Sequence, residues 1–159
     1  MGASMQVTGL DELMRKLDQI GDRAEEVAAR SLYRGAGVMA DAFTQAANSI
    51  RTEEFRYVFN GRKRDPSPEE KAALQGKTGI AKFNINGSEV NTAIGLNGSG
   101  YVTIAGKQKA VKKIANAINS GTSFMNKQPV FRRAASQTSG AARGAIVQAA
   151  EELLNEIIK

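Results

Sequence analysis

The stretch "IAKFNINGSEVNTAIGLNGSGYVTIAG", residues 80–106, decides the fold class. Apolar side chains alternate with polar ones in three short runs, and the dipeptide Asn-Gly separates one run from the next. Alternation with period two is typical of strands that bury one face, and Asn-Gly supplies the positive backbone dihedrals of a tight hairpin turn. The stretch therefore predicts a three-stranded antiparallel meander. The period-two sets are Ala81, Phe83 and Ile85, then Val90, Thr92 and Ile94, then Val102 and Ile104.

Two helices are expected before this sheet. Apolar residues at helical spacing predict a short amphipathic helix from Gly9 to Gly21. Asp22 suits the N-cap of a second, long helix, because its carboxylate can accept the free amide donors of a first turn. Gly35 and Gly37 each cost about 1 kcal/mol relative to alanine in a helix interior, so they indicate a bend or a closely packed neighbour. The apolar stripe of the long helix consists of Ala28, Leu32, Ala36, Met39, Phe43, Ala47 and Ile50.

The segment between the long helix and the sheet, residues 51–79, carries charges, an Asn-Gly pair and two prolines without sustained periodicity. Such a segment predicts a long mobile loop. A helical turn is expected within it at "SPEEKAAL", where Ser67 suits a cap and Pro68 suits the first helical position.

Two further helices are expected after the sheet. Residues 107–119 predict a short basic helix with Val111, Ile114, Ala115 and Ile118 on one face. Residues 118–135 read as a loop. The chain ends with "SGAARGAIVQAAEELLNEIIK", which predicts a final core helix. The fold class is therefore α+β, with a long N-terminal helix and a C-terminal helix on a small antiparallel β-meander. Residues 1–159 form a single domain, in which "MGAS" (1–4) is expected to be an expression remnant before a natural start at Met5.

Composition excludes most catalytic chemistry. The chain has no cysteine and no histidine, so thiolate nucleophiles, Ser-His-Asp catalysis and Cys or His metal ligands are absent from it. The adjacent pairs Glu53–Glu54, Glu69–Glu70 and Glu151–Glu152 point to different sides of a helix and are expected to be solvated. No catalytic, cofactor-binding or metal-binding residue is therefore expected, and the protein is expected not to be an enzyme. No apolar run approaches the roughly 18 residues of a membrane span.

The excess of basic residues permits contact with nucleic acid or another acidic surface but does not require it. The net charge is +6, and "EFRYVFNGRKR" (54–64) interleaves aromatic with basic side chains in the way that single-strand nucleic-acid binders do. The alternation of Phe55, Tyr57 and Phe59 also fits a short strand or arm that packs one face, so both interpretations stay open. The candidate contacts of this loop are Phe55, Tyr57, Phe59, Arg62, Lys63 and Arg64.

The order of two motifs resembles a known family. "GLDELMRKLDQIGDRAEEVAARSLYRGAGVMADAF" resembles the opening and Ala-rich helix of the small neck or tail-completion proteins of long-tailed bacteriophages. "NSGTSFMNKQPVFRRAA" resembles their signature before the last helix. The resemblance covers roughly residues 9–48 and 79–159, and the long charged segment 51–79 replaces a shorter connection.

The resemblance implies a structural role in head–tail joining: a virion protein that forms a ring, alone or only on assembly. Its implied partners are the phage head connector or head-closure protein and the tail terminator or tail tube. DNA would pass through the lumen without sequence-specific binding. The implied location is the virion, with assembly in the host cytoplasm, and neck, tail-completion, minor tail and tail-terminating roles all stay open.

The second motif supplies the candidate subunit or partner contacts, which are Gly121, Thr122, Phe124, Met125, Pro129, Phe131, Arg132 and Arg133. Pro129 restricts the chain, the large apolar side chains can fill a neighbour's groove, and the arginines can make rim contacts. The alternative for Phe124, Met125 and Phe131 is that they plug the protein's own sheet. The alternative function is a small basic nucleic-acid-binding protein.

Overall fold

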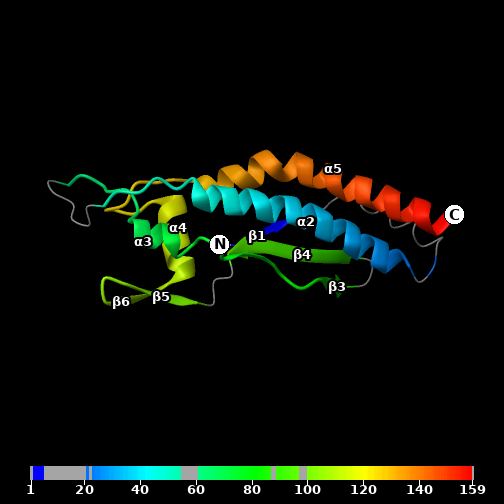
Figure 1. Ribbon diagram of the computed structural model, residues 1–159, viewed down its shortest axis with the longest axis horizontal. Helices are drawn as coiled ribbons and strands as arrows, with labels where there is room; N and C mark the ends of the chain where they lie inside the picture. The colour runs from blue at the N-terminus through cyan, green and yellow to red at the C-terminus, as the bar shows by residue number, and fades with distance from the viewer. Residues whose placement is uncertain are drawn as a thin grey trace.

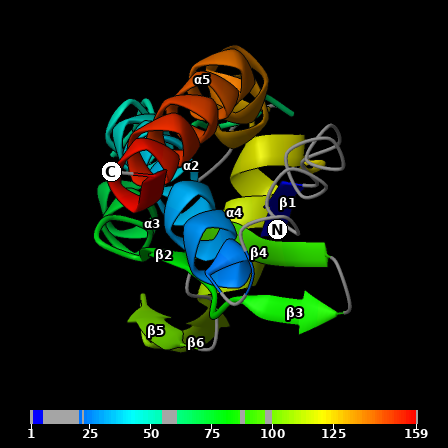
Figure 2. The ribbon, with the colours of Figure 1, turned by 90° about the vertical axis from the view of Figure 1, so that its right-hand side faces the viewer.

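The computed structural model describes residues 2–5, 21, 23–54, 61–86, 89–96 and 100–158. Two long helices, α2 (Ala24–Asn48) and α5 (Val130–Ile158), run side by side along the molecule (Figure 1). Helix α2 lies between α5 and a small antiparallel sheet, so the molecule has three layers (Figure 2). The expected α+β class is confirmed. Among the described residues, no helix combines the length and the apolar character needed to cross a bilayer.

Helix α2 buries the apolar stripe that its sequence predicts. Every residue of that stripe, from Ala28 to Ile50, is buried. Position 22 and the helix expected over residues 9–20 lie outside the described residues, and the residue before α2 is Arg23, which makes no side-chain capping bond. Arg23 therefore stands at the cap position where Asp22 was expected.

Gly35 marks the closest approach of the two long helices. A Cβ atom built on Gly35 would lie 2.4 Å from Cγ1 of Ile146 and 2.8 Å from the carbonyl oxygen of Ala142. Only the hydrogen atom of a glycine fits there. The closely packed helix α5 therefore explains why position 35 is glycine. A Cβ atom built on Gly37 would meet no atom within 4 Å. The helices run antiparallel, because Phe43 near the end of α2 contacts Phe131 at the start of α5, with ring centroids 5.8 Å apart.

Strand β4 (Glu89–Leu96) is the centre of the main sheet. Strand β1 (Gly2–Met5) pairs with one of its edges, and β2 (Thr78–Ile80) and β3 (Asn84–Asn86) pair antiparallel with the other. The hairpin expected between the first two alternating runs is thus confirmed, with Asn86 opposite Glu89. Residues 2–4, set aside as a remnant, form part of a strand, because their backbone pairs with residues 93–95.

The third run of the predicted meander does not join this sheet. Strand β5 (Tyr101–Ile104) pairs instead with β6 (Lys107–Ala110), across a two-residue turn in which Ala105 and Gly106 have φ of 53° and 74°. Positive φ at both positions suits a tight hairpin, so the alternation predicted a strand correctly and its partner wrongly. The expected helix over 107–119 accordingly begins later, as α4 (Val111–Ser120). Its predicted face is confirmed: Val111, Ile114, Ala115 and Ile118 are all buried.

Segment 51–79 has more structure than the expected loop. Ser67 and Glu70 form a reciprocal capping box at the start of α3 (Pro68–Ala72), as the sequence predicts for Ser67 and Pro68. Leu74 is fully buried in the main core, and residues 78–80 form β2. Within the described parts of the segment, 51–54 and 61–79, the residues buried against the fold are Pro66, Ser67, Glu70, Ala73 and Leu74. Residues 55–60 lie outside the described residues.

Candidate functional site

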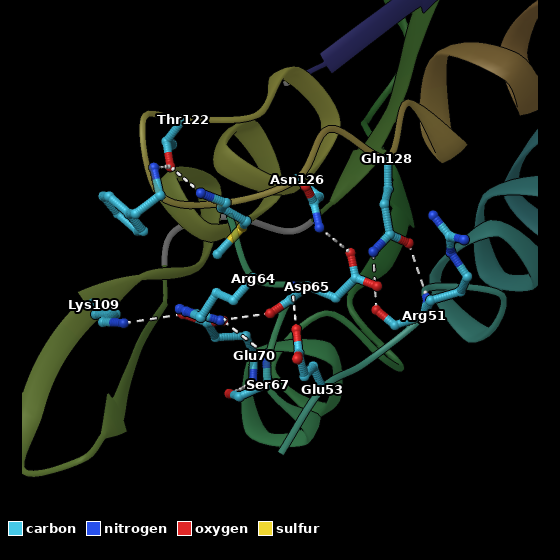
Figure 3. Close-up of polar contacts among 12 residues, drawn as sticks. Arg51, Glu53, Arg64, Asp65, Ser67, Glu70, Lys109, Thr122, Asn126 and Gln128 are labelled. Carbon is cyan, nitrogen blue, oxygen red and sulfur yellow. Dashed lines mark hydrogen bonds and ion pairs between the residues drawn. The ribbon is translucent and has the colours of Figure 1, made fainter. Parts of the chain in front are cut away.

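The candidate site is built on the segment from Gly121 to Gln128, which links α4 to α5. This segment, here called the junction loop, runs parallel to residues 63–65 (Figure 3). The backbone N–H of Arg64 donates to the carbonyl oxygen of Phe124 at 2.9 Å, and the N–H of Asn126 donates to the carbonyl oxygen of Arg64 at 2.8 Å. These two bonds hold the junction loop against a segment about 60 residues earlier in the chain.

Side chains stiffen the first half of the junction loop. The hydroxyl oxygen of Thr122 accepts from the backbone N–H of Met125 at 3.0 Å and from that of Phe124 at 3.3 Å. Gly121 has φ of 75°, and a Cβ atom there would lie 3.1 to 3.3 Å from atoms of Lys127. Glycine is therefore required at position 121 for both its dihedral and its lack of a side chain.

Gln128 anchors the second half of the junction loop to the end of α2. Its buried side-chain amide donates to the carbonyl oxygen of Arg51 at 3.0 Å and accepts from the N–H of Arg51 at 2.9 Å (Figure 3). Its own N–H donates to the carbonyl oxygen of Ile118 at 2.8 Å. One side chain thus satisfies both main-chain groups of a residue 77 positions away. The loop has a fixed place relative to both α2 and α4.

Glu70 fixes the segment against which the junction loop packs. Its carboxylate accepts two hydrogen bonds from the guanidinium of Arg64, at 2.8 and 3.0 Å, and one from Lys109 of β6 at 3.1 Å. Burial raises the pKa of Glu70, but the hydrogen bonds from Arg64, Ser67 and Lys109 outweigh burial and lower the pKa to about 2. The expectation that Glu69–Glu70 is solvated charge is therefore wrong for Glu70, because its carboxylate is buried and paired.

Two hydrogen bonds complete this network. The side chain of Glu53 accepts from the N–H of Asp65 at 3.1 Å, and the carboxylate of Asp65 accepts from the side-chain amide of Asn126 at 3.0 Å. Both bonds hold Asp65, the residue that follows Arg64. A site built in this way is preorganised, since few rotatable groups remain to be ordered when a partner binds.

The candidate contacts divide between the surface and the core. Phe124 has 51% of its surface exposed, and Arg132 and Arg133 are exposed in the first turn of α5. Met125 and Phe131 are buried, and Pro129 is half-buried. Phe131 packs on Phe43 of α2 in the protein's own core, so its ring is not available to a partner. The same holds for Met125, whereas Phe124 stays available to a partner.

The candidate loop contacts also divide. Arg62 and Lys63 are exposed, and Arg62 lies 3.5 Å from the carboxylate of Glu53. The guanidinium of Arg64 is committed to Glu70, with 11% of the side chain exposed. Phe55, Tyr57 and Phe59 lie outside the described residues. Of this set, Arg62 and Lys63 are thus the ones with charges directed to solvent.

Positive charge is concentrated in one part of the sequence. From Val90 to Ala150 the chain has no Asp or Glu but carries Lys107, Lys109, Lys112, Lys113, Lys127, Arg132, Arg133 and Arg143. All of these except Lys109 are exposed. The first five belong to β6, α4 and the junction loop, which lie at the end of the molecule where α2 finishes (Figure 1). Within the part of the chain that the structure describes, no group of three acidic side chains is placed to hold a metal ion.

Sequence reasoning missed Gln128, Glu70, Asn126 and Lys109 as the residues that fix this site. A glutamine directly before Pro129 and the Ser-x-x-Glu spacing of the capping box were the available signals. Comparison with known proteins adds no further candidates: no family model, curated protein or solved structure matches the chain.

Proposed function

We propose that this protein is a structural subunit of a bacteriophage head–tail junction, of the neck or tail-completion type. The observation that carries the proposal is the rigid junction loop, which presents Phe124 to solvent at one end of an elongated helix pair. An aromatic side chain held in place beside cations has the character of an interface anchor. The resemblance of residues 9–48 and 79–159 to phage neck proteins supplies the identity of the assembly.

In this role the subunit joins a ring between the head connector or head-closure protein and the tail terminator or tail tube. DNA passes through the lumen, and the protein performs no chemistry. The exposed cations of β6, α4 and the junction loop are suited to acidic surfaces of these partners.

A complementation assay tests the proposal. Phage heads filled with DNA and isolated tails, both lacking this component, are mixed with purified protein, and infectious particles are counted. We expect joining to be restored, and the half that co-sediments with the protein is its first partner. Phe124→Ala is expected to reduce joining at least tenfold, whereas Val147→Ala, which shortens an equally exposed apolar side chain on α5, leaves it unchanged. Protein that binds neither half and restores no joining would remove the proposal.

A second function is favoured by the acid-free stretch from Val90 to Ala150: a small basic nucleic-acid-binding protein. This alternative requires tight binding whose affinity falls with salt, with a slope of about −0.9 in log K against log[salt] for each DNA phosphate contacted. Lys112→Glu with Lys113→Glu should reduce the slope by about 1.8 if both residues touch phosphates. Lys82→Glu, at an exposed position outside the acid-free stretch, is the control. Tight, salt-dependent binding without restored joining would establish the alternative.

A further inference from the structure

The segment that contains the hairpin β5–β6 and helix α4 carries most of the excess positive charge of the chain. Residues 100–129 contain five lysines and neither a carboxylate nor an arginine, so they account for +5 of the net charge of +6. In comparison, α2 carries three carboxylates and two arginines, and α5 carries three of each. The positive charge is therefore concentrated in one part of the fold, and both views place the hairpin at the edge of the molecule away from α5 (Figures 1 and 2).

Three of these lysines form the exposed surface called here the lysine face. Lys107 lies beside the turn of the hairpin, and Lys112 and Lys113 lie in the first turn of α4, outside its buried face. All three are exposed, and among the described residues none of them forms an ion pair. Lys107 stands roughly 10 Å from the start of α4, at about 3.3 Å per strand residue.

The backbone that carries the lysine face is fixed to the rest of the fold. Ile104 of β5 is buried in the main core, and the N–H of Val111 donates to the carbonyl oxygen of Gly100 at 3.0 Å. The ammonium group of Lys109 donates to the carboxylate of Glu70 at 3.1 Å. The hairpin is thereby tied to α3 and α4, and Lys109 serves this attachment while the lysine face stays free for a partner.

The stability of the fold does not account for Lys112 and Lys113. The start of a helix carries a partial positive charge, so cations in the first turn are repelled where carboxylates would be attracted. Helix α4 has no acidic residue in its first turn, and its N-cap residue makes no side-chain hydrogen bond. Negative charge from outside the subunit compensates this repulsion.

The neutral groups beside the lysine face suit phosphate oxygens. Tyr101 and Thr103 alternate with the buried Ile104, and Thr103 pairs across the hairpin with Gln108, so these polar side chains lie on its outer side. All of them are exposed, and Tyr101 has 70% of its surface exposed. Hydroxyl and amide groups of these residue types, together with lysine, are the usual contacts of proteins to DNA phosphates.

The choice of lysine indicates a partner with phosphates and without a required sequence. Lysine is a point charge and lacks the planar fork with which arginine makes bidentate contacts. Lysine is also depleted from the interfaces between proteins, which makes an acidic protein surface the less suited partner. Duplex DNA carries one negative charge per about 1.7 Å of its axis, so a stretch of roughly 10 Å offers enough phosphates for all three lysines.

We infer that the lysine face contacts the phosphates of the duplex DNA that passes through the junction, so that β5–β6 and the first turn of α4 point toward the axis of the ring. The presence of DNA in a ring rests on the proposed function, whereas the phosphate contact belongs to the chain itself and is measured on the free protein. Three contacts per subunit give weak binding, and a ring repeats them around the duplex. The alternative function differs, because it requires that the free protein bind tightly.

Titration of labelled duplex DNA with the free protein tests the contact. Fluorescence anisotropy is measured with two short duplexes of unrelated sequence. We expect the same Kd for both, in the range of about 10⁻⁴–10⁻⁶ M. Three phosphate contacts, with a slope of about −0.9 each, weaken binding about 40-fold between about 50 and about 200 mM salt.

Two triple variants with the same change in net charge separate the lysine face from charge in general. Replacement of the lysine face by glutamine (Lys107→Gln, Lys112→Gln and Lys113→Gln) is expected to lower the affinity at least tenfold at the lower salt concentration and to remove most of the salt dependence. The matched control removes three exposed cations elsewhere and should bind like the wild type; its substitutions are Lys77→Gln, Lys82→Gln and Arg143→Gln.

Cross-linking in joined particles tests the orientation of the subunit. The natural chain contains no cysteine, so Gln108→Cys places a single thiol on the hairpin and Gln137→Cys places one on α5, both at exposed positions. Each variant is labelled with a thiol-reactive photo-cross-linker, used in the complementation assay and irradiated. The label at position 108 is expected to attach the protein to DNA, and the label at position 137 is not.

Equal loss of affinity in the two triple variants would overturn the inference, as would DNA cross-links no more frequent from position 108 than from position 137. A wild type that binds no duplex at the lower salt concentration also overturns it. If the lysine-face variant then fails to bind heads or tails, those lysines serve an acidic protein surface instead. Selective loss of DNA binding in that variant, without any joining by the wild type, would remove the junction role and leave the phosphate contact standing. Normal joining by a lysine-face variant that binds DNA like the control would have the opposite meaning.

Discussion

A methyl group added at Gly35 should destabilise the protein, and the same group added two residues later at Gly37 should stabilise it. The Cβ atom of Gly35→Ala would lie 2.4 Å from Cγ1 of Ile146 and 2.8 Å from the carbonyl oxygen of Ala142. The Ile146 side chain can rotate, but the Ala142 carbonyl belongs to the backbone of α5, so the helices must move apart. Overpacking of this kind costs about 1–3 kcal/mol, and the backbone clash places Gly35 at the upper end.

Helix propensity acts in the other direction at both positions. Alanine is favoured over glycine in a helix interior by about 1 kcal/mol. Gly35→Ala should therefore lose about 2 kcal/mol net, whereas Gly37→Ala, which meets no atom within 4 Å, keeps the whole gain. For a domain of this size 1 kcal/mol corresponds to about 2–4 °C in Tm. The expected shifts are a fall of about 4–8 °C for Gly35→Ala and a rise of about 2–4 °C for Gly37→Ala.

Calorimetry or urea unfolding followed by circular dichroism measures both variants. Both variants replace glycine by alanine in the same helix, so the gain in helix propensity is the same for both. The difference between their Tm values therefore reports the packing against α5. If both variants shift Tm in the same direction, the close approach of α2 and α5 is not the reason for glycine at position 35. A urea m-value equal to that of the wild type would show that the unfolded states are comparable.

Three other substitutions test the junction loop. The pKa of Glu70 is lowered from 4.5 to about 2 in the folded protein, so its contribution, about 3 kcal/mol, is present above pH 4.5 and lost as the pH falls toward 2. Glu70→Gln should flatten that part of the curve of unfolding free energy against pH, and an unchanged slope would contradict the role of Arg64 and Lys109. Gln128→Ala removes both part-buried hydrogen bonds to the main chain of Arg51, at about 0.5–1.5 kcal/mol each, so it should cost about 1–3 kcal/mol and speed hydrogen exchange at the Arg51 amide; the exposed Gln137→Ala is the control. Gly121→Ala should cost about 1–3 kcal/mol because φ of 75° is strained for alanine, and a neutral effect in urea unfolding would show that the loop can rearrange.

Periodicity in the sequence was sufficient to predict the helices that bury one face. The stripe from Ala28 to Ile50 predicted α2 and its inner face, and the face of α4 followed from four apolar residues. Both patterns are local, because the same few residues that repeat in sequence are buried together in space. The capping box at Ser67 was equally local.

Contacts between distant segments could not be read in this way. The alternation in β5 shows that one of its faces is buried but not which strand pairs with it, so Lys107–Ala110 was assigned to a helix. Glu70 looked like one of two solvated glutamates because its partners, Arg64 and Lys109, stand 6 and 39 positions away. Gln128 carries no pattern at all, since its partner Arg51 is fixed only when α2 and the junction loop meet.

The pairing of α2 with α5 also sets an order of events during synthesis. Eighty-two positions separate Asn48, at the end of α2, from Val130, at the start of α5. At about 5–20 residues per second the ribosome needs roughly 4–16 s to cover that interval. During this time the face of α2 that contains Gly35 has no α5 to cover it. The junction loop is likewise unformed, because its braces reach from Arg51 to Gln128 and from Arg64 to Met125. A nascent chain therefore displays Phe124 in its final setting only after the helix layer has closed.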